Sequence, residues 1–334
     1  MSDDSKTDRG WLKGDFAVRE VLGHFSRIPV AVIALLAGLL LPAISCVKRE
    51  ASREVVIYAA QDQVYAEPIL REFEKETGLK VKAVYDSEAV KTVGLANRLL
   101  AERSHPQCDV FWGNEEMRTR QLAAQGVFRE TNGWAAFGHR SRRIVINTNL
   151  LPLADAPRSL LELTNEIWRG KVALGFPQFG TTATHFHALK QHWGEECWLA
   201  WSRALAANKP FIVDGNSVVV KFVGRGEAWL GLTDSDDVFA GQREGFPVAM
   251  LPINREQLLI PNTVWVIRHA PHPANARKLF EHLQREKVVE KLVAANALES
   301  TTSTSATSTL KPDWEALLRD LETTTGQLSG VFLR

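Results

Sequence analysis

The chain has 334 residues, of which 45% are hydrophobic and 24% are charged, so it is long enough for two globular domains, each with its own core. Its formal net charge of +1 argues against the strongly basic surface that binding to nucleic acid requires. Three cysteines, Cys46, Cys108 and Cys197, do not form a disulfide framework. Because Cys108 and Cys197 lie in apolar runs, we expect both to be buried.

The N-terminal region contains an uncharged stretch over residues 28–47 that follows two arginines. A positive leading region before an apolar run is typical of a secretory signal. Residues 43–46 resemble a lipobox, in which Cys46 would become the lipidated first residue. The stretch is also long enough to remain as a signal anchor that spans the membrane. We therefore predict that residues 1–53 are a signal peptide or membrane anchor with a short linker, and that the rest of the chain lies on the periplasmic side of the cytoplasmic membrane.

Strand, polar loop and helix alternate three times after this region. The polar residues Gln61 and Asp62 follow the first predicted strand, Glu88 follows the second and Glu115 follows the third. This alternation predicts a parallel sheet with helices on its faces, and ligands bind such sheets at the loops that leave the carboxyl ends of the strands. The three strands are predicted over residues 55–59, 79–85 and 109–112.

A second α/β unit begins after a fourth strand, which is predicted over residues 143–147. Residues 171–189 predict a strand, a Pro/Gly turn and a helix that begins at Thr181 or Thr182. The last predicted strand returns to the first unit. The later strands are predicted over residues 211–213, 228–232, 247–251 and 258–267, and the later helices over residues 195–207 and from Pro273, Val288 and Trp314.

The helix start at Thr181 and Thr182 is a candidate anion site. Backbone N–H groups without partners, the positive end of the helix dipole and two hydroxyl groups would meet there. The alternative is that one threonine only caps its own helix. Gly175 and Gly180 have the spacing of a Walker A motif, but Thr181 stands where the phosphate-binding lysine is required, so nucleotide binding is excluded.

Several segments resemble the solute-binding proteins of bacterial ABC importers, specifically the ferric-iron-binding group. The resemblance implies an α/β, two-lobed type II periplasmic-binding-protein fold, with a ligand cleft between two α/β domains joined by hinge strands. Lobe 1 would comprise residues 54–142 and 255–334, with C-terminal helices able to pack on both lobes, and lobe 2 would comprise residues 143–254. The segments that carry the resemblance are residues 55–63, 72–81, 109–111, 180–182 and 259–263.

The resemblance also implies an anion-holding half of the site at Thr181, Thr182 and Asn216. The metal-holding half differs from the family pattern, because adjacent tyrosines are replaced by the acidic loop 233–237. Carboxylates suit oxygen-loving cations and also pair with ammonium groups. Tyr65 is a weaker candidate for a ligand contact. The expected metal ligands are Asp62, Glu115 and Asp236, and the further ligand contacts are Gln61, Glu88 and Asp234.

These features predict an extracytoplasmic receptor of an ABC importer that captures a metal cation with an anion, or a small anionic solute, and delivers it to a permease in the cytoplasmic membrane. We expect a monomer without a resident cofactor and without a nucleic-acid partner. An alternative ligand is a zwitterion such as an aminoalkylphosphonate. A membrane-anchored enzyme is the rival function, but the sequence has no Gly-x-Ser-x-Gly, His-Glu-x-x-His or Rossmann glycine motif.

Overall fold

The computed structural model describes residues 53–85, 91–130, 133–302 and 310–333. The chain from Ser52 onward is one compact unit. Its strands form a nine-stranded sheet in the order β2-β1-β3-β9-β4-β7-β5-β6, and β8 pairs with β4. The predicted site residue Glu88 and the predicted lipidation site Cys46 lie outside the described residues.

The first group of elements surrounds the parallel strands β2, β1 and β3. Apolar side chains on both faces of these strands form two clusters with the covering helices. Gly78 ends the first of these helices, since its φ of 68° is left-handed and its N–H donates to the carbonyl of Glu74. The elements of this group are β1 (Glu54–Ala59), α2 (Gln63–Thr77), β2 (Lys80–Tyr85), α3 (Lys91–Ala101), β3 (Val110–Gly113), α4 (Glu116–Ala124), α9 (Pro273–Leu283) and α10 (Glu286–Ala294).

The second group surrounds the strands β7, β5 and β6, of which β5 is parallel to both neighbours. Two further apolar clusters cover the two faces of this part of the sheet. The elements of this group are three short 3-10 helices (Leu161–Thr164, Glu166–Trp168 and Asn254–Glu256), β5 (Val172–Gly175), α5 (Gly180–Trp193), α6 (Glu195–Ala207), β6 (Phe211–Val213), α7 (Asn216–Gly224), β7 (Leu230–Asp234), α8 (Ser235–Arg243) and β8 (Val248–Leu251).

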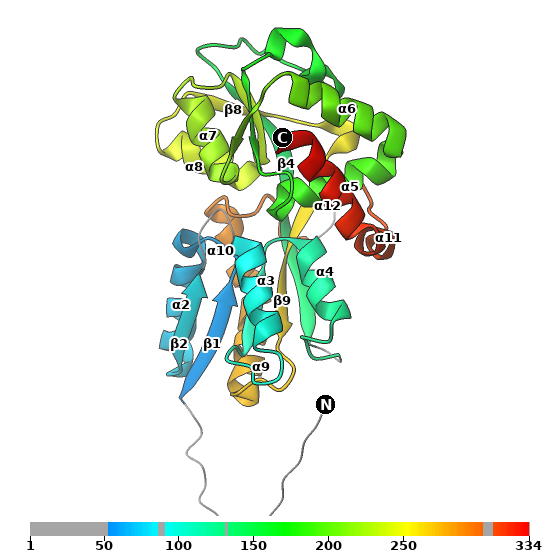
Figure 1. Cartoon of the computed structure of the whole chain (residues 1–334). Helices are drawn as coiled ribbons and strands as arrows, with labels where there is room; N and C mark the ends of the chain where they lie inside the picture. Colours follow the sequence, from blue (N-terminus) through cyan, green and yellow to red (C-terminus); the bar gives the residue numbers. More distant parts are fainter. Residues whose placement is uncertain (1–52, 86–90, 131–132, 303–309, 334) are drawn as a thin grey trace, which may run out of the picture. The chain divides into compact units, whose positions relative to one another are not determined.

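Two antiparallel strands, β4 (Trp134–Asn147) and β9 (Leu259–Val266), connect the two groups (Figure 1). The N-terminal part of β4 pairs with β9, and its C-terminal part pairs with β7 and β8. A β-bulge interrupts β4 at Gly138, where the register shifts between Phe137 and His139. Glycine suits this position because φ is +56° and a Cβ atom would lie 2.5 Å from Leu298 Cδ1.

The C-terminal helices α11 (Trp314–Arg319) and α12 (Leu321–Phe332) lie against α4 of the first group and α5 and α6 of the second group. Met117, Ala183 and Leu321, one from each region, form a small buried cluster there. The C-terminal segment therefore holds side chains of both groups in one apolar contact. The exact lobe boundaries, between residues 142 and 143 and between residues 254 and 255, stay predictions.

Two expectations from the sequence were wrong in detail. Cys108 is buried as expected, but Cys197 is exposed on α6, and both thiols are free. The fourth strand extends nine residues further toward the N-terminus than the predicted 143–147, because β4 begins at Trp134. Within the part of the chain that the structure describes, no helix combines the length and the apolar character needed to cross a membrane.

Candidate functional site

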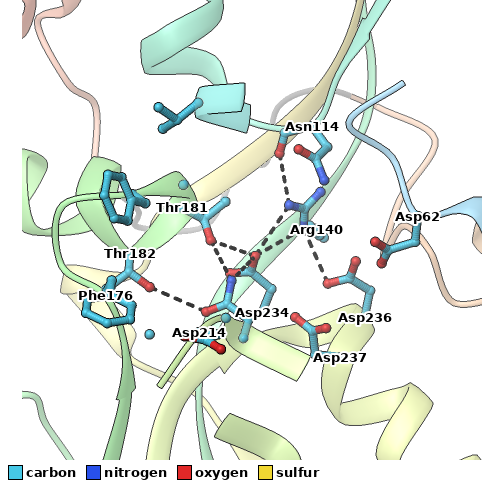
Figure 2. A pocket seen from close by; sticks show the side chains of 16 residues that line it. Asp62, Asn114, Arg140, Phe176, Thr181, Thr182, Asp214, Asp234, Asp236 and Asp237 are labelled. Carbon is cyan, nitrogen blue, oxygen red and sulfur yellow. Dashed lines mark hydrogen bonds and ion pairs between the residues drawn. The ribbon is translucent and has the colours of Figure 1, made fainter. Parts of the chain in front are cut away.

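A pocket of about 620 Å³, including space open to solvent, lies where β4 passes between the two groups of elements (Figure 2). Polar and acidic side chains from both groups face it, together with two phenylalanines. The lining residues are Asp62, Val93, Asn114, Arg140, Gly175, Phe176, Phe179, Gly180, Thr181, Thr182, Asp214, Gly215, Asn216, Asp234, Asp236 and Asp237.

Two arginines of β4 supply the positive charge of the site. Successive side chains of a strand point to opposite faces, so Arg140 and Arg142 share one face. Both are buried, with exposed fractions of 3% and 0%. Arg140 donates from Nη2 to the backbone carbonyl of Asn114 at 2.9 Å and lies 3.3 Å from the carboxylates of both Asp234 and Asp236. It therefore connects the loop after β3 with the acidic loop after β7.

Asp234, at the end of β7, is the most highly bonded carboxylate of the pocket. Its Oδ1 accepts from Arg142 Nη1 at 2.7 Å, and its Oδ2 accepts from Thr181 Oγ1 at 2.8 Å and Asn216 Nδ2 at 3.1 Å. Burial raises the pKa of this carboxyl, but the guanidinium groups of Arg142 and Arg140 lower it more, so the pKa lies below its usual value. Asp234 is thus an ionised carboxylate with its oxygens occupied by donors of this chain.

Asp236, in the first turn of α8, has a different environment. Burial raises its pKa to about 7; Arg140 opposes this shift, and the carboxylates of Asp234 and Asp62 add to it. Oxygen atoms of Asp234, Asp236 and Asp237 all lie within 4.8 Å of one another. Asp62 faces Asp236 in Figure 2. The carboxylates around the pocket outnumber the two arginines, so the pocket favours a positively charged ligand.

The predicted anion half is assembled, but its side chains bind each other. The helix α5 begins at Gly180, with Phe179 at the N-cap position and no side-chain cap, so neither Thr181 nor Thr182 serves as the cap. Thr181 donates to Asp234, and Thr182 Oγ1 lies 3.4 Å from Asn216 Oδ1. Both threonines are buried.

Three predicted residues do not line the pocket. Glu115 caps α4 by accepting from the N–H groups of Met117 and Arg118, and it also accepts from the hydroxyl of Thr184 on α5. Gln61 is buried and accepts from Asn262 on β9 at 3.1 Å. The hydroxyl of Tyr65, the weaker candidate, accepts from Arg243 of α8 at 2.6 Å. The described predicted residues that do line the pocket are Asp62, Thr181, Thr182, Asn216, Asp234 and Asp236.

The local sequence pattern did not identify five residues of the site, namely Arg140, Arg142, Phe176, Phe179 and Asp214. The strand that carries Arg140 and Arg142 was predicted to begin only at residue 143, so no face could be assigned to them. The run Arg140-Ser-Arg-Arg143 is the available signal, because four consecutive polar residues directly before an apolar strand are unusual for a covered sheet.

Comparison with known proteins defines the family. The family model described as "Bacterial extracellular solute-binding protein" matches residues 55–295, which is more than half of the chain. The chain belongs to this family.

Among curated members of the solute-binding proteins, the chain is 30% identical over 218 residues to the Fe(3+)-binding periplasmic protein of Serratia marcescens, covering 60% of this chain and 62% of that protein. It is 26% identical over 193 residues to the major ferric iron-binding protein of Neisseria gonorrhoeae, covering 52% of this chain and 56% of that protein. These alignments thus span less than two thirds of the relatives' length.

Solved structures of solute-binding proteins share the fold. Iron-bound HitA from Pseudomonas aeruginosa superposes with a TM-score of 0.71 at 19% identity, covering 83% of this chain and 99% of HitA. AfuA from Actinobacillus pleuropneumoniae, with fructose-6-phosphate bound, gives 0.71 at 18% identity, covering 84% of this chain and 98% of AfuA. The predicted two-lobed α/β fold of a type II periplasmic binding protein is confirmed.

The raised pKa of Asp236 predicts how the stability of the empty protein depends on pH. The unfolded carboxyl titrates near 3.8 and the folded one near 7, so the folded state holds this proton more tightly. The free energy of unfolding that depends on Asp236 is therefore largest below about pH 4 and falls as the pH rises to about 7. Urea unfolding of wild type and Asp236→Asn across this range measures the effect. As the pH rises from about 4 to about 7, the free energy of unfolding of wild type should fall relative to that of the variant. A constant difference would contradict the assignment.

Proposed function

We propose that this protein is an extracytoplasmic receptor that captures a cation in the pocket and delivers it to an ABC permease in the cytoplasmic membrane. The observation that carries the proposal is the set of carboxylates of Asp62, Asp236 and Asp237 at the pocket wall. An oxygen of Asp236 and one of Asp237 lie within 4.8 Å of each other. The names of the curated relatives support a metal as cargo, and ferric iron is the first candidate.

Carboxylate oxygen replaces phenolate oxygen as the proposed ligand type. The three tyrosines of the chain are Tyr58, Tyr65 and Tyr85, and the pocket lining contains none of them. Asp236 and Asp237 on α8, with Asp62 from the loop after β1, provide hard anionic oxygens from both sides of the pocket. A hard cation is attracted by such a set, and its binding would replace Asp236's proton or its contact with Arg140.

Metal analysis of the full-length protein, isolated without chelators, is the direct test. We expect a metal to copurify in a ratio near one per chain. After removal of the metal, titration with ferric iron as its nitrilotriacetate chelate, and with Mn²⁺ and Ca²⁺, identifies the preferred cation. A protein that retains no metal and binds none of these ions would overturn the proposal.

An organic ammonium ligand is the second candidate, and a specific observation favours it. Phe176 and Phe179 line the pocket beside the carboxylates, and aromatic faces attract ammonium groups. The predicted aminoalkylphosphonate shares this amine, which would pair with Asp236 or Asp62. The residues expected to hold its phosphonate, Thr181 and Asn216, donate to Asp234 instead, so an ammonium ion without a phosphonate fits better. Native mass spectrometry of the isolated protein separates the two candidates, because an organic ligand and a metal differ in mass.

We further propose that the receptor has no catalytic turnover, as expected for a family of solute-binding proteins. Retention of the cargo without chemical change, followed by mass spectrometry over several hours, tests this part. A product that accumulates beyond one equivalent per chain would identify an enzyme.

The proposed place of action is the periplasmic side of the cytoplasmic membrane, and the name of the Serratia marcescens relative, which calls that protein periplasmic, supports this. Anchoring through a lipid on Cys46 is motivated by the lipobox-like residues 43–46. The variant Cys46→Ser should then lose the lipid and keep residues 1–45, as intact-mass measurement would reveal. If the wild-type protein already keeps its full N-terminus in the membrane, it is held by a signal anchor instead.

A further inference from the structure

The N-terminal end of α5, where the sequence predicts an anion site, is already filled by a carboxylate of the chain itself. One oxygen of Asp234 accepts from the hydroxyl of Thr181 at 2.8 Å (Figure 2) and from the amide of Asn216 at 3.1 Å. The other oxygen accepts from Arg142 at 2.7 Å. These side-chain donors include Thr181 and Asn216, two of the three residues expected to hold an anion at this helix start. Since they converge on Asp234, a separate anion has no donors left among them.

Burial strengthens the contacts that Asp234 makes with Arg142, Thr181 and Asn216. Asp234 has an exposed fraction of 1%, and Arg142 and Thr181 are also buried. Hydrogen bonds between charged groups are stronger than neutral ones, and a charge buried without partners is costly. Two arginines offset the single negative charge of Asp234, so the carboxylate is held in its ionised state.

A free anion would have to displace a tethered one. The backbone of β7 fixes Asp234, which ends a strand paired with both β4 and β5. A group held in place competes at an effective concentration far above that of a small ion in solution. We therefore expect phosphate at millimolar concentration not to replace Asp234 in the wild type.

We propose that Asp234 is a built-in anion that replaces the external anion at the start of α5, so that the pocket takes its cation without a co-bound phosphate or carbonate. The cation part of this inference rests on the proposed function, whereas the built-in anion does not. The cargo class is accordingly a bare or hydrated cation, or an organic ammonium ion, and not a cation–anion pair.

Variants at Asp234 test this inference with inorganic phosphate as the probe and without any cargo. Thermal melts of wild type, Asp234→Ala and Asp234→Asn are recorded at increasing phosphate concentration and constant ionic strength. Both variants leave Arg142, Thr181 and Asn216 without their carboxylate. Phosphate should raise their melting temperature by roughly 5 °C or more at a hundredfold excess over its dissociation constant. Wild type should show no such rise.

The matched control is Asp214→Asn, which removes one exposed negative charge from the same pocket but keeps the carboxylate that Thr181 and Asn216 bind. It should behave like wild type toward phosphate. A phosphate-dependent rise in wild type, or its absence in both Asp234 variants, would overturn the inference. An Asp234 variant that remains unfolded even in phosphate would also overturn it, because phosphate is expected to replace the missing carboxylate.

The outcome for the proposed function is separate. If the wild type binds no cation at all but the Asp234 variants gain a phosphate site, the proposal for Asp234 is supported and the proposed function as a cation receptor is rejected. If the wild type binds a cation more tightly when phosphate is added, the proposed function as a cation receptor is supported and the proposal for Asp234 is rejected.

Discussion

The double variant Asp62→Asn with Asp236→Asn is expected to lose cation binding by a factor of about 10² to 10⁴. Each carboxylate would contribute a charge-assisted contact of about 1.5–3 kcal/mol, and a loss of 1.4 kcal/mol is tenfold in affinity. Asp62 belongs to the loop after β1 and Asp236 to α8, so the two replacements remove a ligand from each side of the pocket. Isothermal titration with the cation found by metal analysis measures the change.

The empty fold of this double variant should be at least as stable as wild type near pH 8, since the carboxylates of Asp62 and Asp236 repel each other. Asp155→Asn is a suitable control, because Asp155 is exposed and outside the pocket. It should leave binding and stability unchanged. Cation binding by the double variant that equals binding by the control would reject Asp62 and Asp236 as ligands.

The variant Arg142→Met is expected to lower the free energy of unfolding by about 3–5 kcal/mol, the usual cost of removing one partner of a buried ion pair. Arg142 is fully buried, and its Nη1 also lies 2.9 Å from Asn216 Oδ1 and 3.3 Å from Thr181 Oγ1. Its removal leaves Asp234 with Arg140 as its remaining cation. Urea unfolding at pH 7 measures the loss.

Arg143→Met provides the matched comparison on the same strand. Arg143 pairs with Glu299 at 2.9 Å, and both side chains are partly exposed, at 18% and 21%. Solvent weakens such a pair, so this variant should cost clearly less than Arg142→Met. Equal losses in the two variants would show that the buried ion pair between Arg142 and Asp234 contributes no more to the free energy of unfolding than the partly exposed pair does. Adding Asp234→Leu to Arg142→Met should recover part of the stability, because no buried carboxylate remains unpaired.

The sequence predicted the fold because its signals are local and repeated. The β-branched run of β1, the glycine that ends α2 and the boundaries of α6 at residues 195–207 follow from apolar periodicity and capping rules. The position of Thr181 at the start of α5 was predicted within one residue for the same reason. These elements bring Asp62, Thr181, Asn216 and Asp236 to one pocket, as expected from their places after strands.

The pairing of charges inside the pocket could not be predicted from local patterns. Glu115 and Asn114 are neighbours, yet Asn114 lines the pocket while Glu115 turns to cap α4 and to meet Thr184. That choice depends on the packing of α4 against α5, which are far apart in sequence. Similarly, Arg142 and Asp234 are separated by 92 residues, so only the pairing of β4 with β7 shows that the apparent anion site holds a carboxylate.

The bulge at Gly138 determines which side chains of the rest of β4 point to each face of the sheet. Beyond it, Arg140 lines the pocket and Arg142 binds Asp234 on the same face of the strand, while Ser141 and Arg143 face Glu299 on the other side. A shift by one residue exchanges the two faces of a strand. A homologue that lacks this single extra residue would thus present the opposite set of side chains to the same pocket, even with an identical Arg-Ser-Arg-Arg run. One insertion or deletion, far from the acidic loop, can in this way halve the positive charge that the strand brings to the site, so comparisons of cargo preference within the family must count residues from the bulge.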